Sequence, residues 1–213
     1  MKRLLAMLLF VGCAAPVLAS PAATWQREIT APDRKRLARL WDAWTQSLDE
    51  VVKAGQGAAL KALGPVAVPD AATINGGPGI SGAVAGELPV PGEYKCRMVR
   101  LGQREGGTKA PVAAMVDAGA MLPCRIEARG DGLWLEQRGG AQRLGGRLYV
   151  DGGQLVFLGA TALRGEMGVM PYGADPQRDA VGALRAMGKL HWRLELPWPH
   201  WQSNLAIVEI VPA

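Results

Sequence analysis

The chain has few of the residues from which catalytic and metal centres are built. Its 213 residues include three cysteines and two histidines. None of them has the spacing of a metal site, no serine lies in a nucleophile motif, and no glycine-rich loop has the pattern that cradles a phosphate. We therefore expect no metal and no cofactor. An enzyme, such as an unrecognised hydrolase acting through His191 or His200, stays open as a hypothesis but is not favoured.

The chain also lacks a concentrated charge of one sign. It carries 24 basic and 19 acidic residues, and the basic residues are spread along the sequence. Nucleic-acid binding proteins gather their basic residues in a patch or stripe. This distribution argues against a nucleic-acid partner.

The first 19 residues have the three parts of an export signal. A basic start at Lys2 and Arg3 precedes an apolar run, and a small-residue exit ends at Ala19. Cleavage after Ala19 predicts a periplasmic or secreted protein. The alternative is a lipoprotein anchored through an acylated Cys13, the one route by which we expect membrane attachment. No later stretch is apolar enough to span a bilayer.

Removal of the signal leaves two cysteines, Cys96 and Cys124. Both fall in segments with the alternation of a strand, and in an oxidising compartment we expect them to pair. Such a bond would stabilise the fold by about 3 to 4 kcal/mol. A reactive thiol or a metal ligand is the weaker alternative, because no histidine lies near them in the sequence.

Residues 20–91 are expected to form a helical segment and a linker. Apolar residues recur at helical spacing from Thr30 to Lys53, and Thr30 with Asp33 predicts the N-terminal cap. A basic run within this helix favours a solvated face over a binding site: Arg34, Lys35, Arg36 and Arg39. The stretch after it, up to Gly92, is rich in glycine, alanine and proline and predicts a loosely packed linker with a short helix at 58–63.

Residues 92–213 are expected to form an antiparallel β domain. The period becomes alternating, which predicts strands near 93–101, 121–128, 132–138, 144–150, 154–163, 181–187, 189–196 and 204–211. The last-but-one strand is expected to be half buried, with Leu190, Trp192, Leu194 and Leu196 inward and Lys189, His191, Arg193 and Glu195 on the polar face. The fold class is therefore mainly β with an N-terminal α-helix. We expect an up-and-down barrel of lipocalin-like or avidin-like architecture, with a two-sheet sandwich as the alternative.

Several short strings resemble one bacterial family. They are Gly92-Glu93-Tyr94-Lys95-Cys96-Arg97, Pro123-Cys124-Arg125-Ile126, Tyr172-Gly173-Ala174-Asp175-Pro176, Trp192-Arg193-Leu194 and the ending Glu209-Ile210-Val211-Pro212. On these residues the chain resembles an uncharacterised bacterial exported family, domain of unknown function 4893. The resemblance extends over most of the mature chain. The family has no established activity, so the resemblance implies no substrate, cofactor or catalytic residue.

Two polar or aromatic loops are the candidate binding residues. One contains Tyr172, Asp175, Arg178 and Asp179, and the other contains Trp198, His200 and Trp201. The first loop is an ordinary turn or one rim of a barrel mouth, of which the second loop would form another rim. We expect the protein to bind a small molecule or a component of the cell envelope. The alternative is a protein-interaction or inhibitor module, and inward-facing aliphatics such as Leu135 and Leu148 favour a filled barrel with function on its loops.

Overall fold

The computed structural model describes residues 25–69, 88–103, 115–130, 132–200 and 203–213. The N-terminal signal and Cys13 therefore lie outside the described residues, as does Trp201. The described part begins with four short helices and a 3-10 turn: α1 (Trp25–Glu28), α2 (Ala31–Ala38), α3 (Leu40–Lys53), α4 (Gly57–Ala62) and η1 (Gly64–Ala67).

The expected single helix over Thr30–Lys53 is divided in two at Arg39. Thr30 caps α2 as predicted, because its side chain accepts a hydrogen bond from the Asp33 amide. Arg39 then leaves helical geometry, with φ −107° and ψ 25°, and α3 begins at Leu40. Arg39 and Leu40 both have good intrinsic helix propensity, so no local signal predicts the break.

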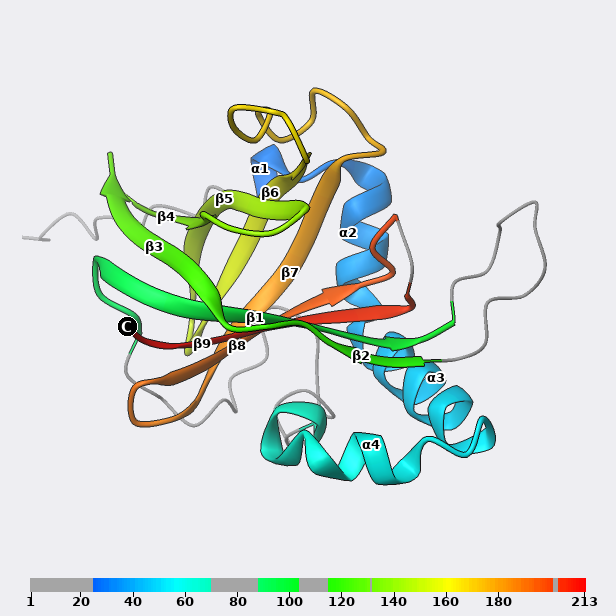
Figure 1. The fold of residues 1–213 in the computed structure, drawn as a ribbon. Coiled ribbons are helices and arrows are strands. Elements are labelled where there is room, and N and C mark those ends of the chain that lie inside the picture. The colour runs from blue at the N-terminus through cyan, green and yellow to red at the C-terminus, as the bar shows by residue number, and fades with distance from the viewer. Residues whose placement is uncertain (1–24, 70–87, 104–114, 131, 201–202) are drawn as a thin grey trace, which may run out of the picture.

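Nine strands follow the helices. They are β1 (Gly92–Gly102), β2 (Met115–Ala118), β3 (Leu122–Arg129), β4 (Gly132–Gln137), β5 (Gln142–Asp151), β6 (Gln154–Leu163), β7 (Asp179–Gly188), β8 (His191–Pro197) and β9 (Leu205–Pro212). Each of β3 to β9 pairs antiparallel with its neighbour in sequence, and β1 pairs with both β3 and β9. Eight strands thus close an antiparallel barrel (Figure 1), which confirms the predicted architecture.

The strand pattern differs from the prediction in two places. β2 was not expected, and it pairs with the second half of β1, from Val99 to Gly102. Leu190 was expected to point into the barrel, but it lies in the β7–β8 turn with φ 56° and is 47% exposed. The strand therefore begins at His191, after a shift of register between Ala186 and Gly188.

The interior of the barrel is filled by side chains. One cluster of buried residues supplied by β1 and β3 to β9 occupies it, including Ile126, Leu148, Phe157, Trp192 and Val208. Glycines admit the largest of these groups: a Cβ on Gly159 would lie 2.4 Å from the Phe157 ring and 2.3 Å from the Gly145 carbonyl oxygen. Packing this close leaves no room for a side chain at that position. The barrel is a packed core.

Cys96 and Cys124 form a disulfide within this core, as predicted. Their Cα atoms are 5.8 Å apart, and both side chains are almost completely buried. The bond joins β1 to β3, which also pair directly through Cys96 and Leu122. Burial on this scale makes the bond a structural cross-link.

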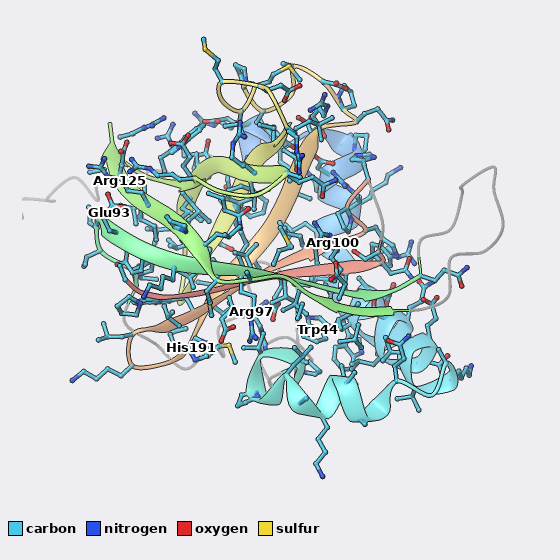
Figure 2. The ribbon with its side chains drawn as sticks, in the orientation of Figure 1. Trp44, Glu93, Arg97, Arg100, Arg125 and His191 are labelled. Carbon is cyan, nitrogen blue, oxygen red and sulfur yellow. A yellow bond between two sulfur atoms is a disulfide. The ribbon has the colours of Figure 1, made fainter. Side chains whose placement is uncertain are left out.

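The helices cover part of the outer barrel wall (Figure 1). α3 and η1 bury Trp44 and Val66 against outward residues of β1, β7 and β9, while α1 and α2 bury Trp25 and Leu37 against β5, β6 and β7. Figure 2 shows Trp44 directed from α3 toward the strands. The helical segment is therefore a second layer on the barrel.

This layer changes the environment of β8. Arg193 and Glu195 were expected on a solvated face, yet they are 1% and 0% exposed. They do face outward, as the alternation predicts, but the helical layer lies over them. Alternation identifies the face of a strand and says nothing of what covers that face.

Candidate functional site

Both loops predicted to bind a ligand lie at the same end of the barrel, because one precedes β7 and the other follows its antiparallel neighbour β8. Arg36 of α2 contacts both. Its guanidinium donates to the backbone oxygen of Trp198 at 3.0 Å and to that of Asp179 at 3.2 Å. The same group bonds the Asp33 carboxylate. The structure thus brings the two loops together, with α2 between them.

The loop containing Tyr172 and Asp179 holds α2 in place. The Tyr172 hydroxyl donates to the Asp33 carboxylate at 2.6 Å and accepts from the Thr30 amide at 3.1 Å. Burial, reinforced by the Asp33 carboxylate, raises the pKa of Tyr172 far above its ordinary value. The hydroxyl therefore stays protonated at physiological pH and acts as a structural donor.

Asp179 is buried at the start of β7. Its carboxylate accepts a hydrogen bond from the Gly173 amide at 2.9 Å. Burial raises the pKa of Asp179 and the nearby Asp33 charge adds to this, although the Gly173 bond and Arg36 oppose the shift. Its contacts bind the loop to itself and to α2.

Asp175 and Arg178 form an ordinary turn, one of the two interpretations of this loop given from the sequence. The Asp175 side chain accepts from the Gln177 amide at 2.9 Å, an ordinary Asx turn. Arg178 pairs with Glu166 at 3.0 Å and, more distantly, with Asp175 at 3.9 Å. The Leu163 amide and Arg178 lower the pKa of Glu166. These residues close the β6–β7 connection on itself, so they are not grouped around a space.

Trp198 lies in an unusual backbone conformation. Its φ is 40°, in the left-handed region that disfavours a bulky side chain by about 1 to 2 kcal/mol. The Trp198 amide donates to the Asn204 carbonyl at 2.7 Å, and the Asn204 side chain donates to Glu50 of α3 at 2.8 Å. Asn204, directly before β9, and Glu50 of α3 thus hold the loop in this conformation. His200 lies in the same loop and is partly buried.

A hollow of about 350 Å³ opens beside Trp198. Its lining comes from two distant parts of the chain, the α2–α3 segment and the β8–β9 loop: Lys35, Arg36, Arg39, Gln46 and Trp198. Of the six predicted ligand-binding residues that the structure describes, Trp198 is the one in this lining. The basic residues were expected on a solvated face. The missed signal was that a basic run shares its helical segment with an apolar stripe that packs on the barrel.

Arg39 and Trp198 make the central contact of the hollow. The Arg39 guanidinium carbon lies 4.8 Å from the centre of a Trp198 ring, a stacking arrangement that orients the guanidinium. The Arg39 Nε donates to Asp42 at 2.9 Å. Arg36 differs, because its nitrogens are committed to Asp33 and to the two backbone oxygens.

A second hollow, of about 500 Å³, lies at the N-terminal end of β1. It is lined by Pro91, Gly92, Glu93, Arg125, Ile126, Glu127 and Ala128. Figure 2 shows Glu93 and Arg125 side by side at this end, away from α3. Arg125 pairs with Glu93 at 3.3 Å and with Glu127 at 3.0 Å. Bonding to Arg129, together with nearby arginines, lowers the pKa of Glu127. Carboxylates and a guanidinium together line this hollow, whereas the described lining of the first hollow has three cations and no carboxylate.

Three charged residues are buried between the barrel wall and the helical layer. Glu195 bonds Arg193 at 2.7 Å and lies 3.4 Å from Arg185 on β7. Arg193 also donates to the Val68 carbonyl at 2.6 Å and lies against the Trp44 ring. This cluster ties α3 and the segment after η1 to the barrel. It is too enclosed to meet a ligand, so we assign it a structural role.

The described lining of the first hollow carries charged and polar groups and one aromatic ring. It presents guanidinium and ammonium groups, an amide and an indole, none of which is a nucleophile or a general base at neutral pH. Within the described ranges, no three histidine, cysteine, aspartate or glutamate side chains gather in a way that would hold a metal ion.

Fold and site together define a class: a disulfide-linked, eight-stranded antiparallel barrel with a filled interior, whose outer helical layer meets a barrel loop to form a cationic hollow. The chain belongs to the family described as a domain of unknown function, DUF4893, which matches residues 25–210. No curated protein and no solved structure matches it.

Two observations bear on the compartment. The disulfide is compatible with an oxidising, exported environment. Among the helices of the described residues, none has the length and apolar character needed to cross a membrane.

Proposed function

We propose that the protein is an exported binding protein that holds a small anionic molecule in the hollow between α2, α3 and the β8–β9 loop. The observation that carries this proposal is the lining of that hollow, which combines Lys35, Arg36 and Arg39 with Trp198, over whose ring Arg39 lies. Concave sites with a few convergent polar groups and an aromatic surface are typical of small-molecule recognition.

The local charge supports an anion. Three basic residues line the hollow, Lys35, Arg36 and Arg39, and two acids bond to them, Asp33 and Asp42, which leaves a net charge of +1. Asp33 compensates Arg36, and Asp42 partly compensates Arg39. Among the described residues, Lys35 has no acidic partner. An anion in the hollow would meet positive charge that the protein itself does not neutralise.

The rigidity of the hollow supports binding as well. Trp198 is held in a strained conformation by Asn204, and Arg36 is fixed by the Asp33 carboxylate and the two loop carbonyls. Strained backbone held by its surroundings is concentrated at functional sites. A site fixed before the ligand arrives loses less conformational freedom on binding.

The filled barrel supports a site on the outside. Lipocalin-like and avidin-like barrels hold ligands in their interiors, but here Phe157, Trp192 and other large side chains occupy that space. We place binding on the rim for this reason. The export pattern of residues 1–19 and the disulfide favour the periplasm or another oxidising compartment as the place where binding occurs.

Isothermal titration calorimetry with a panel of small anions tests the proposal. The panel comprises inorganic phosphate, glycerol 3-phosphate, citrate and glucuronate, with glucose as the neutral member. At least one anion should bind, and Arg39→Ala should weaken it about tenfold or more, because a charge-assisted hydrogen-bond pair is lost.

The chain provides a matched control. Arg129 lies 4.5 Å from the centre of a Trp134 ring on the barrel wall, and neither residue lines the hollow. Arg129→Ala removes the same charge and the same kind of stack, and it should leave binding unchanged. The proposal is wrong if no anion in the panel binds, or if Arg129→Ala weakens binding as much as Arg39→Ala.

A further inference from the structure

We infer that the anion is a phosphomonoester carried on a hydroxylated body, held by Arg39 as a fork and by Lys35 as a second cation. This inference rests on the proposed function, since it specifies the ligand of the same hollow. It follows from which donors in the hollow are already used and which are not.

The outer edge of Arg39 has the geometry for a phosphate. Its Nε is bonded to Asp42 and its guanidinium carbon lies over the Trp198 ring, while its two terminal nitrogens make no hydrogen bond within the described part of the chain. A guanidinium stacked in this way presents two parallel N–H groups, which match two oxygens of a phosphate or a carboxylate.

A second cation, Lys35, favours a phosphate over a carboxylate. Lys35 lies four residues before Arg39 and lines the same hollow. Its ammonium adds a point charge to the fork, and Asp33 already neutralises Arg36. Arg39 and Lys35 both line the hollow, so a doubly charged phosphate gains more Coulomb attraction from the two cations than a singly charged carboxylate does. A phosphomonoester is a dianion above pH ~6.

Gln46 and Trp198 account for the body of the ligand. The Gln46 amide nitrogen donates to Glu50 at 3.0 Å, so its carbonyl oxygen is an acceptor that no described residue uses. That oxygen can take a hydrogen bond from a ligand hydroxyl. The indole offers an apolar edge beside it. A sugar phosphate or glycerol phosphate has this combination of groups, and so does the headgroup of a lipid that ends in a phosphomonoester.

The test compares ligands that differ in charge state, with the purified full-length protein and calorimetry as the readout. Glycerol 3-phosphate is the phosphomonoester, glucuronate is the carboxylate, and dimethyl phosphate is a phosphate that remains a monoanion. At pH 7.5 glycerol 3-phosphate should bind at least tenfold more tightly than either of the other two, because it alone is a dianion.

The pH dependence supplies the second readout. From pH 7.5 to pH 5 the dianionic fraction of a phosphomonoester falls about tenfold, so its affinity should fall by about tenfold. The ionisable residues on the elements around the hollow include His200, Asp33, Asp42 and Glu50. The charge of dimethyl phosphate does not change over this interval, so any loss of its affinity measures the contribution of the protein groups. The loss of affinity for glycerol 3-phosphate should exceed that for dimethyl phosphate.

Vesicle binding distinguishes a soluble phosphomonoester from the phosphomonoester headgroup of a lipid. Sedimentation with phosphatidic acid, a terminal phosphomonoester, is compared with phosphatidylglycerol, a diester, and with phosphatidylcholine. Preferred binding to phosphatidic acid would identify a lipid headgroup as the source. Binding of glycerol 3-phosphate without vesicle binding would identify a soluble ligand.

Variants connect these readouts to the hollow. Arg39→Lys keeps the charge but removes the fork, and it should weaken glycerol 3-phosphate at least fivefold, while Lys35→Arg should retain binding. Circular dichroism must show both variants folded. If glucuronate binds as tightly as glycerol 3-phosphate and Arg39→Ala weakens it, the inference fails and the proposed function stands. If no anion and no vesicle binds, both fail.

Discussion

Substitution of Glu195 by glutamine should be among the most destabilising single changes in this protein. Glu195 is 0% exposed and is bonded to Arg193 at 2.7 Å, with Arg185 at 3.4 Å. Arg185 and Arg193 are directly opposed in the β7–β8 register. Glutamine would leave two buried guanidiniums beside one another without this carboxylate. Removal of one partner from a buried ion pair costs about 3 to 5 kcal/mol, and we expect Glu195→Gln to lower the free energy of unfolding by that amount.

Arg185→Met is the matched control. The Arg185 Nε and Nη2 atoms are buried and find no hydrogen-bond acceptor among the described residues. Methionine keeps an unbranched apolar stem like that of arginine, removes these unsatisfied donors, and leaves one arginine for one glutamate. Replacement of a buried ion by an apolar side chain is often neutral or stabilising. Arg185→Met should therefore lower the stability by no more than about 1 kcal/mol.

Urea unfolding followed by tryptophan fluorescence measures both changes, and the double variant completes the cycle. In the Glu195→Gln background, Arg185→Met should restore part of the lost stability, because it removes the repulsion between the two guanidiniums. A loss below about 1 kcal/mol for Glu195→Gln would refute the reasoning. So would an Arg185→Met variant that loses as much stability as Glu195→Gln.

Three further predictions concern other parts of the fold. Gly159→Ala should cost about 1 to 3 kcal/mol in urea unfolding, because its Cβ would lie 2.4 Å from the Phe157 ring, while Gly168→Ala, with nothing within 4 Å, should be nearly neutral. Replacement of Cys96 and Cys124 by alanine should lower the free energy of unfolding by about 3 to 4 kcal/mol, since the closed loop spans 28 residues; a loss below 1 kcal/mol would contradict this. Burial raises the pKa of Asp179, so the native state binds that proton more tightly than the unfolded chain, and stability should fall as pH rises above about 4. Asp179→Asn keeps an acceptor for the Gly173 amide and should flatten this pH dependence, and an unaltered profile would show that Asp179 is not its source.

The barrel was predictable because its signal is local. Alternation of apolar residues and glycine-containing turns specify antiparallel neighbours one pair at a time, and closure follows from the need to protect the edges. β2 was not predicted because its four residues, Met115–Ala118, are too few to establish an alternating period. The exposure of Leu190 was not predicted because a register shift displaces the β7–β8 turn, and alternation alone does not reveal such a shift.

The candidate site was only partly predictable, because its residues meet through the fold. Trp198 was identified from its aromatic loop, but Arg36, to which it is bonded, lies 162 positions away in the sequence. The sequence of residues 34–39 would show the same basic run if these side chains faced solvent or if they faced a barrel loop, so the sequence does not distinguish the two cases. The same reasoning explains Arg193 and Glu195, whose burial depends on Trp44 and Val68, both distant in sequence.

The position of the hollow follows from two local departures from regular geometry that meet at one contact. α2 ends where Arg39 leaves helical geometry, and the β8–β9 loop turns where Trp198 takes φ 40°. Neither residue type requires its conformation: the Trp198 amide is bonded to the Asn204 carbonyl, and the Arg39 side chain is bonded to Asp42 three residues further along α3. The two side chains then stack on one another at the entrance of the hollow. Departures from local preference in native proteins tend to fall at functional sites, and this coincidence is the physical reason to look for the ligand there and not inside the barrel.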